Sequence, residues 1–488
     1  MARSSPWRRR LAPLLAALWG LSTAAVAQDK PRAEILWDTW GVPHIYAATD
    51  EDLFYAVGWA TMHNHADVVL RLYGQARGRA AEYWGESYAE SDRQVLILKA
   101  PERARSALAQ QDPAFRAKLD AYAAGVNAYA AAHRDRIADE VEVVLPVTAA
   151  DLLAHQQRSG VLPFAFAALQ EETEAWKGRG SNAWAIGPKH SKSGNAMLVL
   201  NPHIPWGEAV FGGLFRVFEV DLKSPSLDFY GTLQVGGPVV SGGFSDHLGY
   251  THTVNTLDDV DVYELTLADG GYLYDGAVRA FEETKTSFKV KGKDGGFETR
   301  PLTVRWSVHG PVVAEKPGKA MAVRLASLDL PFQYEQFWQM ASSRSLDEFL
   351  AAVRRLQIPK SNLLYADAAR NTFYLAGGRI PARTHGDYAF WAGMIDGATS
   401  KTLWTDYLPM EALPQALNPP AGWLQNANEP PWYVTRPAAF TPEQFPAWMS
   451  PRRLGLRPQR SLRMMTDTGP MSFEEVAADK LSTRSELA

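Results

Sequence analysis

The feature that most constrains the fold is a long stretch, residues 215–325, in which nearly every segment has the pattern of a β-strand. The segments rich in β-branched and aromatic residues are Phe215–Leu222, Leu227–Leu233, Asp259–Leu267 and Thr303–Val308. Ala268–Gly271 and Lys293–Gly296 have the composition of hairpin turns. Helical patterns lie on both sides of this stretch and do not alternate with its strands. The chain is therefore predicted to be an α+β protein with two antiparallel sheets covered by helices.

The chain before this stretch is mainly helical in its pattern. Residues 50–84 have apolar side chains spaced by three and four, and a second helix is predicted from the Asp-Pro pair at 112–113 towards residue 133. Residues 148–151 resemble a capping box that starts a further helix. Residues 34–46 are instead predicted to form two short strands joined by a turn.

The first 27 residues are predicted to be a signal peptide. Arg8–Arg10 form a basic region, Leu11–Leu21 an apolar region, and Ala25–Ala27 a cleavage site with small residues. The mature protein is therefore expected in a bacterial periplasm or outside the cell. No later stretch is apolar enough to span a bilayer, so no membrane contact is expected after the signal is removed.

Composition excludes several classes of function. The 488 residues carry a net charge of −4, and no run of Lys and Arg follows the first ten residues, so no nucleic-acid partner is expected. The chain contains no cysteine, which excludes disulfides, thiol nucleophiles and Cys-ligated metals. A content of 46% hydrophobic residues is sufficient for a large core.

A second local pattern lies just before the strand-rich stretch. Asn182–Ile186 and Ala196–Leu200 are two apolar segments separated by a turn cluster, and together they predict a β-hairpin. The ends of a hairpin lie close together. Ser181, at the start of the first strand, and His203, just past the second, are therefore expected to be neighbours.

These residues resemble a known family. The runs Gly180-Ser181-Asn182-Ala183-Trp184 and Asn201-Pro202-His203-Ile204-Pro205-Trp206 are similar to the start of the catalytic chain in penicillin acylases, especially the cephalosporin and acyl-homoserine-lactone acylase branches. Penicillin acylases are N-terminal nucleophile hydrolases, whose precursor cuts itself before the serine. The resemblance implies an αββα sandwich and cleavage between Gly180 and Ser181.

The resemblance also implies a division of the chain. After the signal peptide, 28–155 correspond to the smaller chain, 156–180 to an excised spacer, and 181–488 to the larger, catalytic chain. The two mature chains are expected to remain together as an αβ heterodimer. The family's larger chain continues beyond the position that matches residue 488, so the catalytic chain is expected to be incomplete here.

Catalytic roles follow from the same resemblance. The free α-amine of Ser181 is expected to be the base that activates its own hydroxyl, since such an amine has a pKa of about 7.7–8.0. The oxyanion hole is expected to consist of the N–H of Val254, within a His-Thr-Val-Asn run, and the side chain of Asn428, within Gln-Asn-Ala-Asn-Glu-Pro-Pro-Trp. His203 is expected to orient the serine, with a purely structural role as the alternative. Arg457 matches a supporting arginine.

A structural calcium ion is the one cofactor that the resemblance suggests. Asp258-Asp259-Val260-Asp261 is similar to a calcium-binding run of penicillin-G-type relatives, in which the ligands match Asp258, the carbonyl of Val260, and Asp261. The alternative is an acidic turn that faces solvent. No organic cofactor is expected.

The substrate is expected to be an N-acylated small molecule with a neutral acyl chain, such as an acyl-homoserine lactone or a penicillin-like amide. No Lys or Arg occurs between Lys223 and Arg279, the region in which glutaryl-specific relatives hold a carboxylate. The predicted activity is hydrolysis of a linear amide. The alternatives are an inert relative that only binds ligands and a carbohydrate-binding protein. A Ser-His-Asp hydrolase is disfavoured, because no Gly-x-Ser-x-Gly motif occurs.

Overall fold

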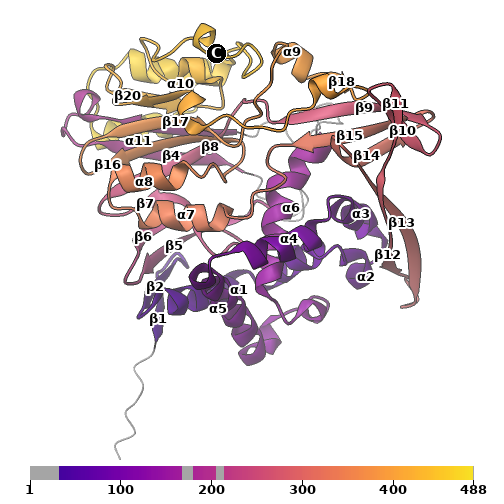
Figure 1. Cartoon of the computed structure of the whole chain (residues 1–488). Coiled ribbons are helices and arrows are strands. Elements are labelled where there is room, and N and C mark those ends of the chain that lie inside the picture. Colours follow the sequence, from indigo (N-terminus) through magenta and orange to yellow (C-terminus); the bar gives the residue numbers. More distant parts are fainter. Residues whose placement is uncertain (1–31, 168–179, 205–213, 487–488) are drawn as a thin grey trace, which may run out of the picture.

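The computed structural model describes residues 32–167, 180–204 and 214–486 (Figure 1). The predicted signal peptide, residues 168–179 of the predicted spacer, and the last two residues of the Asn201–Trp206 motif lie outside these ranges. Within them, no helix has the length and apolarity that a membrane span requires.

The helices begin where the sequence supplies capping residues. Thr49 caps the first helix by accepting from the N–H of Asp52, Asp112 caps α5 by accepting from Ala114 N–H, and Thr148 N–H donates to the carboxylate of Asp151 at 2.8 Å. The helices are α1 (Asp50–Ala76), α2 (Ala80–Trp84), α3 (Ala89–Ile97), α4 (Ala100–Gln110), α5 (Pro113–Ala132), α6 (Ala149–Ala167), α7 (Gln333–Ser342), α8 (Leu346–Val353), α9 (Tyr388–Trp391), α10 (Leu456–Thr466) and α11 (Phe473–Lys480).

The strands of the described residues form three sheets. The central sheet contains, in spatial order, β1 (Ala33–Trp37), β2 (Pro43–Ala47), β5 (Val217–Lys223), β6 (Asp228–Gln234), β7 (Val240–Phe244), β8 (Leu248–Val254), β16 (Ser361–Asp367), β17 (Thr372–Gly377) and β19 (Gln415–Leu417). The hairpin sheet contains β20 (Trp423–Asn426), β3 (Gly180–Ile186) and β4 (Met197–His203).

The side sheet is separate from these two. Its order is β11 (Ala277–Ala280), β10 (Gly271–Tyr274), β9 (Val260–Ala268), β15 (Lys319–Leu325), β14 (Gly310–Lys316), β13 (Phe297–Ser307) and β12 (Glu282–Lys291), with β18 (Met394–Asp396) beside β9. The long β12–β13 arm lies beside α2 (Figure 1), and Arg300 on the arm pairs with Glu86 at 2.6 Å.

The β3–β4 hairpin belongs to one of four stacked layers, which confirms the α+β prediction. The hairpin sheet packs on the central sheet, and α7 and α8 cover the other face of the central sheet, where Phe349 lies 4.6 Å from the ring of Tyr365 (Figure 1). On the outer face of the hairpin sheet, Trp184 packs with Met465 of α10 and Val476 of α11. The order helix, sheet, sheet, helix is the sandwich that the resemblance implied.

Two features differ from the sequence-based expectation. The strands of residues 215–325 divide between the central and side sheets, while the hairpin sheet supplies the second layer of the sandwich. The central sheet is also not wholly antiparallel, because β2 pairs in parallel with β5, where His44 lies 2.8 Å from Asp221. Pairing between segments so distant in sequence is not encoded in a local alternation pattern.

The predicted spacer begins inside a packed helix. Helix α6 continues to Ala167, and Arg158, Val161 and Ala165 on it are buried. Arg158 donates to Gln75 of α1 at 2.6 Å. The domain boundary stays a prediction, and these contacts favour a spacer that begins after residue 167.

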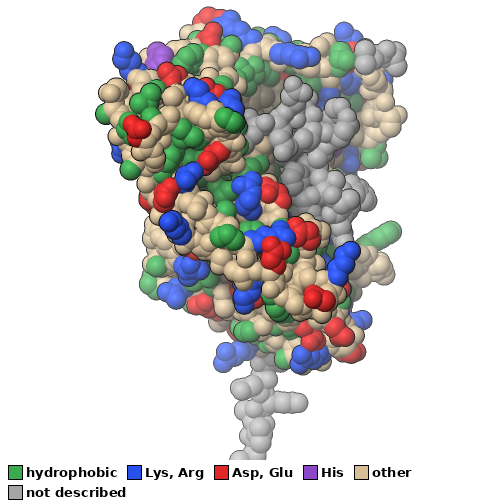
Figure 2. Space-filling model, turned by 90° about the vertical axis from the view of Figure 1, so that its right-hand side faces the viewer, with side chains coloured by type: hydrophobic (Ala, Val, Ile, Leu, Met, Phe, Trp, Pro, Cys, Tyr) green, Lys and Arg blue, Asp and Glu red, His purple; other side chains and the backbone are tan. Residues whose placement is uncertain are grey.

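Charges are mixed on one face of the molecule. On the face drawn in Figure 2, acidic and basic side chains are interspersed, with no extended patch of one sign. This distribution agrees with the small net charge of −4.

Candidate active site

The site is organised by the β3–β4 hairpin, whose register pairs the first residue of β3 with the last residue of β4. Ser181 lies opposite Pro202. Side chains alternate between the two faces of a strand: Ala183 belongs to the core shared with the central sheet, whereas Trp184 packs under α10. The same alternation directs the side chain of Ser181 towards the central sheet and that of His203 towards α10.

Ser181 is buried, with 7% of its surface exposed, and its hydroxyl and backbone N–H are both hydrogen-bonded. Its hydroxyl donates to the carbonyl oxygen of Gly180 at 2.7 Å. Its backbone N–H donates to Oδ1 of Asn428 at 2.5 Å. The hydroxyl therefore contacts the carbonyl group of the peptide bond that the predicted cleavage would break.

Asn428 connects this serine to the end of β8. It lies in the loop after β20 with φ of 66°, a left-handed conformation that Asn tolerates better than most residues. Its N–H donates to Oδ1 of Asn426, and its Nδ2 donates to the backbone oxygen of Val254, both at 2.8 Å. Val254 is the last residue of β8. The two residues expected to form the oxyanion hole are thus in direct contact beside Ser181.

Arg457, in the first turn of α10, holds three oxygens from two segments, β3 and the loop after β20. One terminal nitrogen donates to the backbone oxygen of Ser181 and to Oδ1 of Asn182, both at 2.6 Å. The other donates to Oδ1 of Asn428 at 2.7 Å. A planar guanidinium can make these contacts simultaneously, whereas the ammonium of a lysine could not reproduce their geometry.

The structure distinguishes among three arginines of this helix. Arg460 and Arg463 lie 3.9 and 2.7 Å from the carboxylate of Glu486, away from the serine. Burial lowers the pKa of Arg457 from its ordinary value, and the carboxyl of Glu429 acts in the opposite sense. An arginine remains charged under such conditions, so Arg457 supplies a fixed positive charge next to Ser181.

Gly180 is the residue that this crowded arrangement requires. A Cβ atom added to Gly180 would lie 2.6 Å from Oδ1 of Asn428 and in closer overlap with the guanidinium of Arg457. Both of these side chains are held by other hydrogen bonds, so neither is free to move aside. Only glycine fits before Ser181 while the two side chains keep their contacts.

His203 lies next to the serine's strand on the α10 side. Its Nε2 is 3.3 Å from Nδ2 of Asn201 and 3.5 Å from Nδ2 of Asn182, so the ring nitrogen is placed to accept from the two amides. Burial lowers the pKa of His203, and the cations of Arg457 and Lys480 lower it further. The ring is therefore neutral at pH 7. Among the contacts of the described residues there is none between this ring and Ser181, and its catalytic role stays a prediction.

Glu429 is a component of the site that sequence reasoning missed. It is fully buried behind the loop, where Ala427 N–H donates to its carboxylate at 2.6 Å and Gln425 Nε2 donates to its other oxygen. Burial raises the pKa of Glu429 to about 7. In the sequence, only its position directly after Asn428 pointed to a role for Glu429 in the site. Its burial depends on contacts between distant segments, which the local sequence does not reveal.

The residues expected to hold calcium do not fit a metal ion. The guanidinium of Arg383 lies 3.0 Å from Asp258 Oδ2 and 2.8 Å from Asp261 Oδ1, where it occupies the space between the two carboxylates. Val260, whose carbonyl was the third expected ligand, lies opposite Leu325 in the β9–β15 ladder. No cluster of three or more His, Cys, Asp or Glu suited to a metal occurs in the described ranges.

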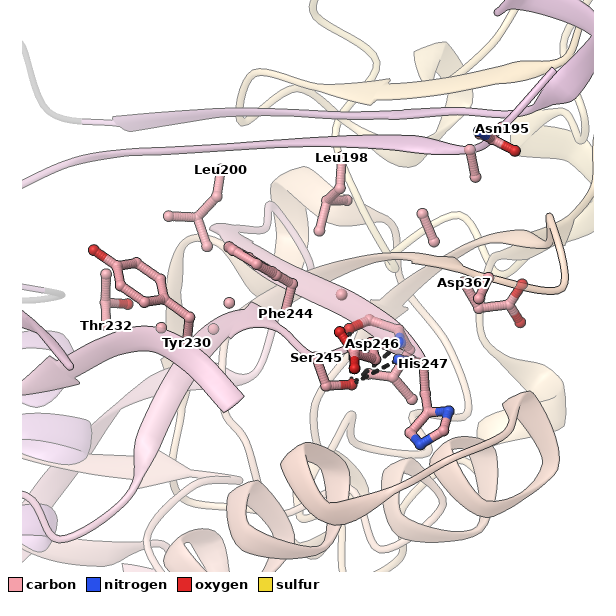
Figure 3. Close-up of a pocket in the computed structure, with 18 of the residues that line it drawn as sticks. Asn195, Leu198, Leu200, Tyr230, Thr232, Phe244, Ser245, Asp246, His247 and Asp367 are labelled. Atoms are coloured by element: carbon pink, nitrogen blue, oxygen red, sulfur yellow. Dashed lines mark hydrogen bonds between the residues drawn. The ribbon is translucent and has the colours of Figure 1, made fainter. Parts of the chain in front are cut away.

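A cavity of about 630 Å³ lies between the hairpin sheet and the central sheet. Figure 3 shows Leu198 and Leu200 projecting from β4 towards the region of Phe244 on β7. Leu200 is two residues along β4 from Pro202, which lies opposite Ser181. The cavity thus lies along the face of the hairpin towards which the Ser181 side chain points, but Ser181, Val254, Asn428 and Arg457 are not among the residues that line it.

Comparison with known proteins finds relatives of this chain. The chain is 29% identical over 477 residues to acyl-homoserine lactone acylase PvdQ of Pseudomonas syringae pv. syringae (strain B728a), covering 84% of this chain and 60% of the relative. It is 28% identical over 539 residues to PvdQ of Pseudomonas putida, covering 95% and 68%. The chain thus spans about three fifths of the first of these relatives.

A solved structure shows the same fold. The thermostable penicillin G acylase from Alcaligenes faecalis, in its orthorhombic form, is 23% identical, with a TM-score of 0.52 over 61% of this chain and 51% of that chain. The model of the penicillin amidase family matches residues 32–488, which is nearly the whole chain. This chain belongs to the penicillin amidase family.

Proposed function

We propose that this chain is a self-processing amidohydrolase that releases the acyl group of an N-acylated small molecule, with Ser181 as its N-terminal nucleophile. The observation that carries the proposal is the convergence of the loop after β20 and of α10 on Ser181. Its hydroxyl contacts the Gly180 carbonyl, its N–H contacts Asn428, and Arg457 holds its backbone oxygen. Membership of the penicillin amidase family supports the same reaction class.

Processing begins with the Ser181 hydroxyl, which lies 2.7 Å from the Gly180 oxygen. Oγ attacks the Gly180 carbonyl carbon, the C–N bond to Ser181 breaks, and the hydroxyl proton passes to the departing amine. Water then hydrolyses the resulting ester. The products are a carboxylate at Gly180 and a chain that begins with the free amine of Ser181.

Turnover uses the groups that processing leaves in place. The new amine, still beside Asn428 Oδ1, takes the proton of the Ser181 hydroxyl as Oγ attacks the substrate amide. The tetrahedral oxyanion is stabilised by Asn428 Nδ2 and Val254 N–H, each donor contributing about 2.7–4 kcal/mol. The amine product leaves with the transferred proton, and water releases the acyl group. His203 orients the serine through the neighbouring amides.

The favoured substrate has a neutral acyl chain. Leu198, Leu200 and Phe244 line part of the cavity on the face of the hairpin towards which the Ser181 side chain points. The matched relatives are named acyl-homoserine lactone acylases, and the structural neighbour is a penicillin G acylase. An acyl-homoserine lactone or a penicillin-like amide is therefore the substrate class to test.

The mature protein is proposed to be an exported heterodimer without an organic cofactor. Export rests on the signal-peptide pattern of residues 1–27. Association of the two mature chains is supported by contacts that cross the cleavage point, such as the β2–β5 ladder and the bond from Tyr73 Oη to Gly236 O at 2.9 Å.

N-terminal sequencing and intact mass measurement test the processing step. The expected result is a chain that begins at Ser181. Ser181→Ala should remain uncut and inactive towards acyl-homoserine lactones and penicillin G, whereas Ser193→Ala, in the exposed turn of the same hairpin, should be cut normally. An uncut wild-type chain that binds these amides without hydrolysing them would favour a binding protein instead.

Gly180→Ala tests the packing that surrounds the cleaved bond. The added methyl group would overlap Arg457 and Asn428 and push them out of position. If this displacement removes one hydrogen bond to the oxyanion, cleavage should slow by at least about 100-fold. The matched control is Gly187→Ala on the same hairpin, where the nearest atom would lie at an ordinary 3.4 Å. Equal cleavage of both variants, followed over time by gel electrophoresis, would reject the proposed geometry.

A further inference from the structure

The described residues contain a fully buried arginine between two carboxylates. Arg383 lies between β17 and α9, and its side chain has 0% exposure. One guanidinium nitrogen is 3.0 Å from Asp258 and another is 2.8 Å from Asp261. Asp261 is equally inaccessible at 0% side-chain exposure, and Asp258 is exposed by 8%. All three charges are therefore removed from water together.

Aromatic rings complete the surroundings of this arginine. Its Cζ atom lies 4.5 Å from the ring centroid of Trp391 and 5.5 Å from that of Trp448, both within the range of cation–π attraction. The indole N–H of Trp404 donates to the carboxylate oxygen of Asp261 that Arg383 does not contact. The pocket is thus shaped for a flat organic cation with apolar faces, which is the form of a guanidinium group.

Asp259, the third carboxylate of residues 258–261, is also paired with a cation of the protein. Lys360, at the start of β16, lies 2.5 Å from Asp259 Oδ1, and its ammonium donates to the backbone oxygen of Leu257 at 3.0 Å. The N–H of Asn255 donates to the backbone oxygen of Lys360 at 2.9 Å. Together these bonds fix the segment that immediately follows Val254, whose backbone oxygen accepts from Asn428 Nδ2.

A divalent metal ion and Arg383 cannot occupy this position together. Calcium requires carboxylate oxygens at about 2.3–2.6 Å and six to eight oxygen ligands in all. The guanidinium already lies between the two nearest carboxylates, and the rings of Trp391 and Trp448 supply no oxygen to a metal.

We infer that Arg383 is an internal cation that takes the place of a metal ion in fixing the segment after β8, so that the folded chain requires no calcium. The guanidinium joins that segment and the start of β9 to the region before α9, as a bridging metal would. The inference concerns stability and does not rest on the proposed hydrolase function.

Thermal unfolding of the wild-type chain with and without calcium is the first test. The Tm should change by less than about 1 °C when excess EDTA or millimolar CaCl₂ is added, because no bound ion is lost or gained. Elemental analysis after dialysis should show no calcium retained by the protein. A Tm that falls by more than about 2 °C in EDTA and is restored by CaCl₂ would overturn the inference.

Arg383→Met tests the role of the arginine itself. Removing the guanidinium leaves two buried carboxylates without a partner, so the Tm should fall by about 5 °C or more. The matched control is Arg354→Met, which breaks an exposed pair with Glu411 at 3.1 Å and should change the Tm by less than about 1 °C. A Tm for Arg383→Met within about 2 °C of the wild type would overturn the inference.

A third variant separates lost charge pairing from lost packing. In Arg383→Met combined with Asp258→Asn and Asp261→Asn, no unpaired buried charge remains. This triple variant should be more stable than Arg383→Met alone, and should fold even where the single variant is insoluble. A triple variant no more stable than the single one would show that the arginine acts by filling space, against the inference.

Discussion

Asn428 shows how a single side chain serves both states of the proposed site. Its Oδ1 accepts from Ser181 N–H in the intact chain, and its Nδ2 is the group expected to stabilise an oxyanion. Asn428→Ala should lower kcat by about 10²–10³-fold, measured on acyl-homoserine lactone hydrolysis after processing is complete. The matched control is Asn418→Ala, because Asn418 is also left-handed (φ 47°) but lies on the exposed surface. Equal losses in both variants would trace the effect to backbone strain.

Glu429 should give the protein a measurable pH dependence. Burial raises its pKa from 4.5 to about 7, so the folded chain holds a proton that the unfolded chain releases. The contribution to stability is therefore fully present below about pH 4.5 and is lost as the pH rises through 7. Glu429→Gln cannot ionise, so it does not lose this contribution as the pH rises. The Tm of the variant minus the Tm of the wild type should therefore increase from pH 5 to pH 8. A constant difference in Tm across this range would contradict the assignment.

At the level of elements, α10 supports the hairpin that carries the serine. Trp184 is buried between β3 and α10, and its indole N–H donates to Ser461 at 2.9 Å. Trp184→Ala should lower the free energy of unfolding by about 3–5 kcal/mol. Trp40→Ala removes a tryptophan that is 89% exposed and should cost less than about 0.5 kcal/mol. Urea denaturation of the two variants measures the difference, and similar values would show that Trp184 is not a core residue.

The elements themselves were largely predictable from local sequence. Alternation identified the β3–β4 hairpin, and Thr148 with Asp151 marked the start of α6, because both signals depend on neighbouring residues. The separation of the side sheet and the parallel β2–β5 pair were not predicted. These depend on contacts between distant segments, which periodicity does not specify.

The site was predictable only in part. Ser181, Val254, Asn428 and Arg457 were named from a family resemblance, and the structure brings these four together. Spacing alone could not have assembled residues separated by more than two hundred positions. The buried Glu429 and Arg383 were missed for the same physical reason: their roles arise from tertiary surroundings, which a charged residue in a loop does not reveal.

At the scale of the whole molecule, the helices of residues 50–167 and the β-rich region after residue 180 share one core. Residues of α1, α5 and α6 belong to the same apolar cluster as residues of the central sheet. The two processed chains should therefore remain together in about 1 M NaCl, which screens exposed ion pairs but does not weaken apolar contacts. Size-exclusion chromatography in high salt checks this. Elution of two separate fragments would show that surface charges hold the chains together.

The parallel pairing of β2 with β5 has a consequence for producing the protein in pieces. Residues 43–47 and 217–223 are adjacent strands of one sheet, although a cut before residue 181 would assign them to different polypeptides. Each piece made separately would present an unsatisfied strand edge and a bare apolar face, and would aggregate. Functional reconstitution should then require co-translation or joint refolding of the two pieces, and simple mixing of separately purified halves should fail.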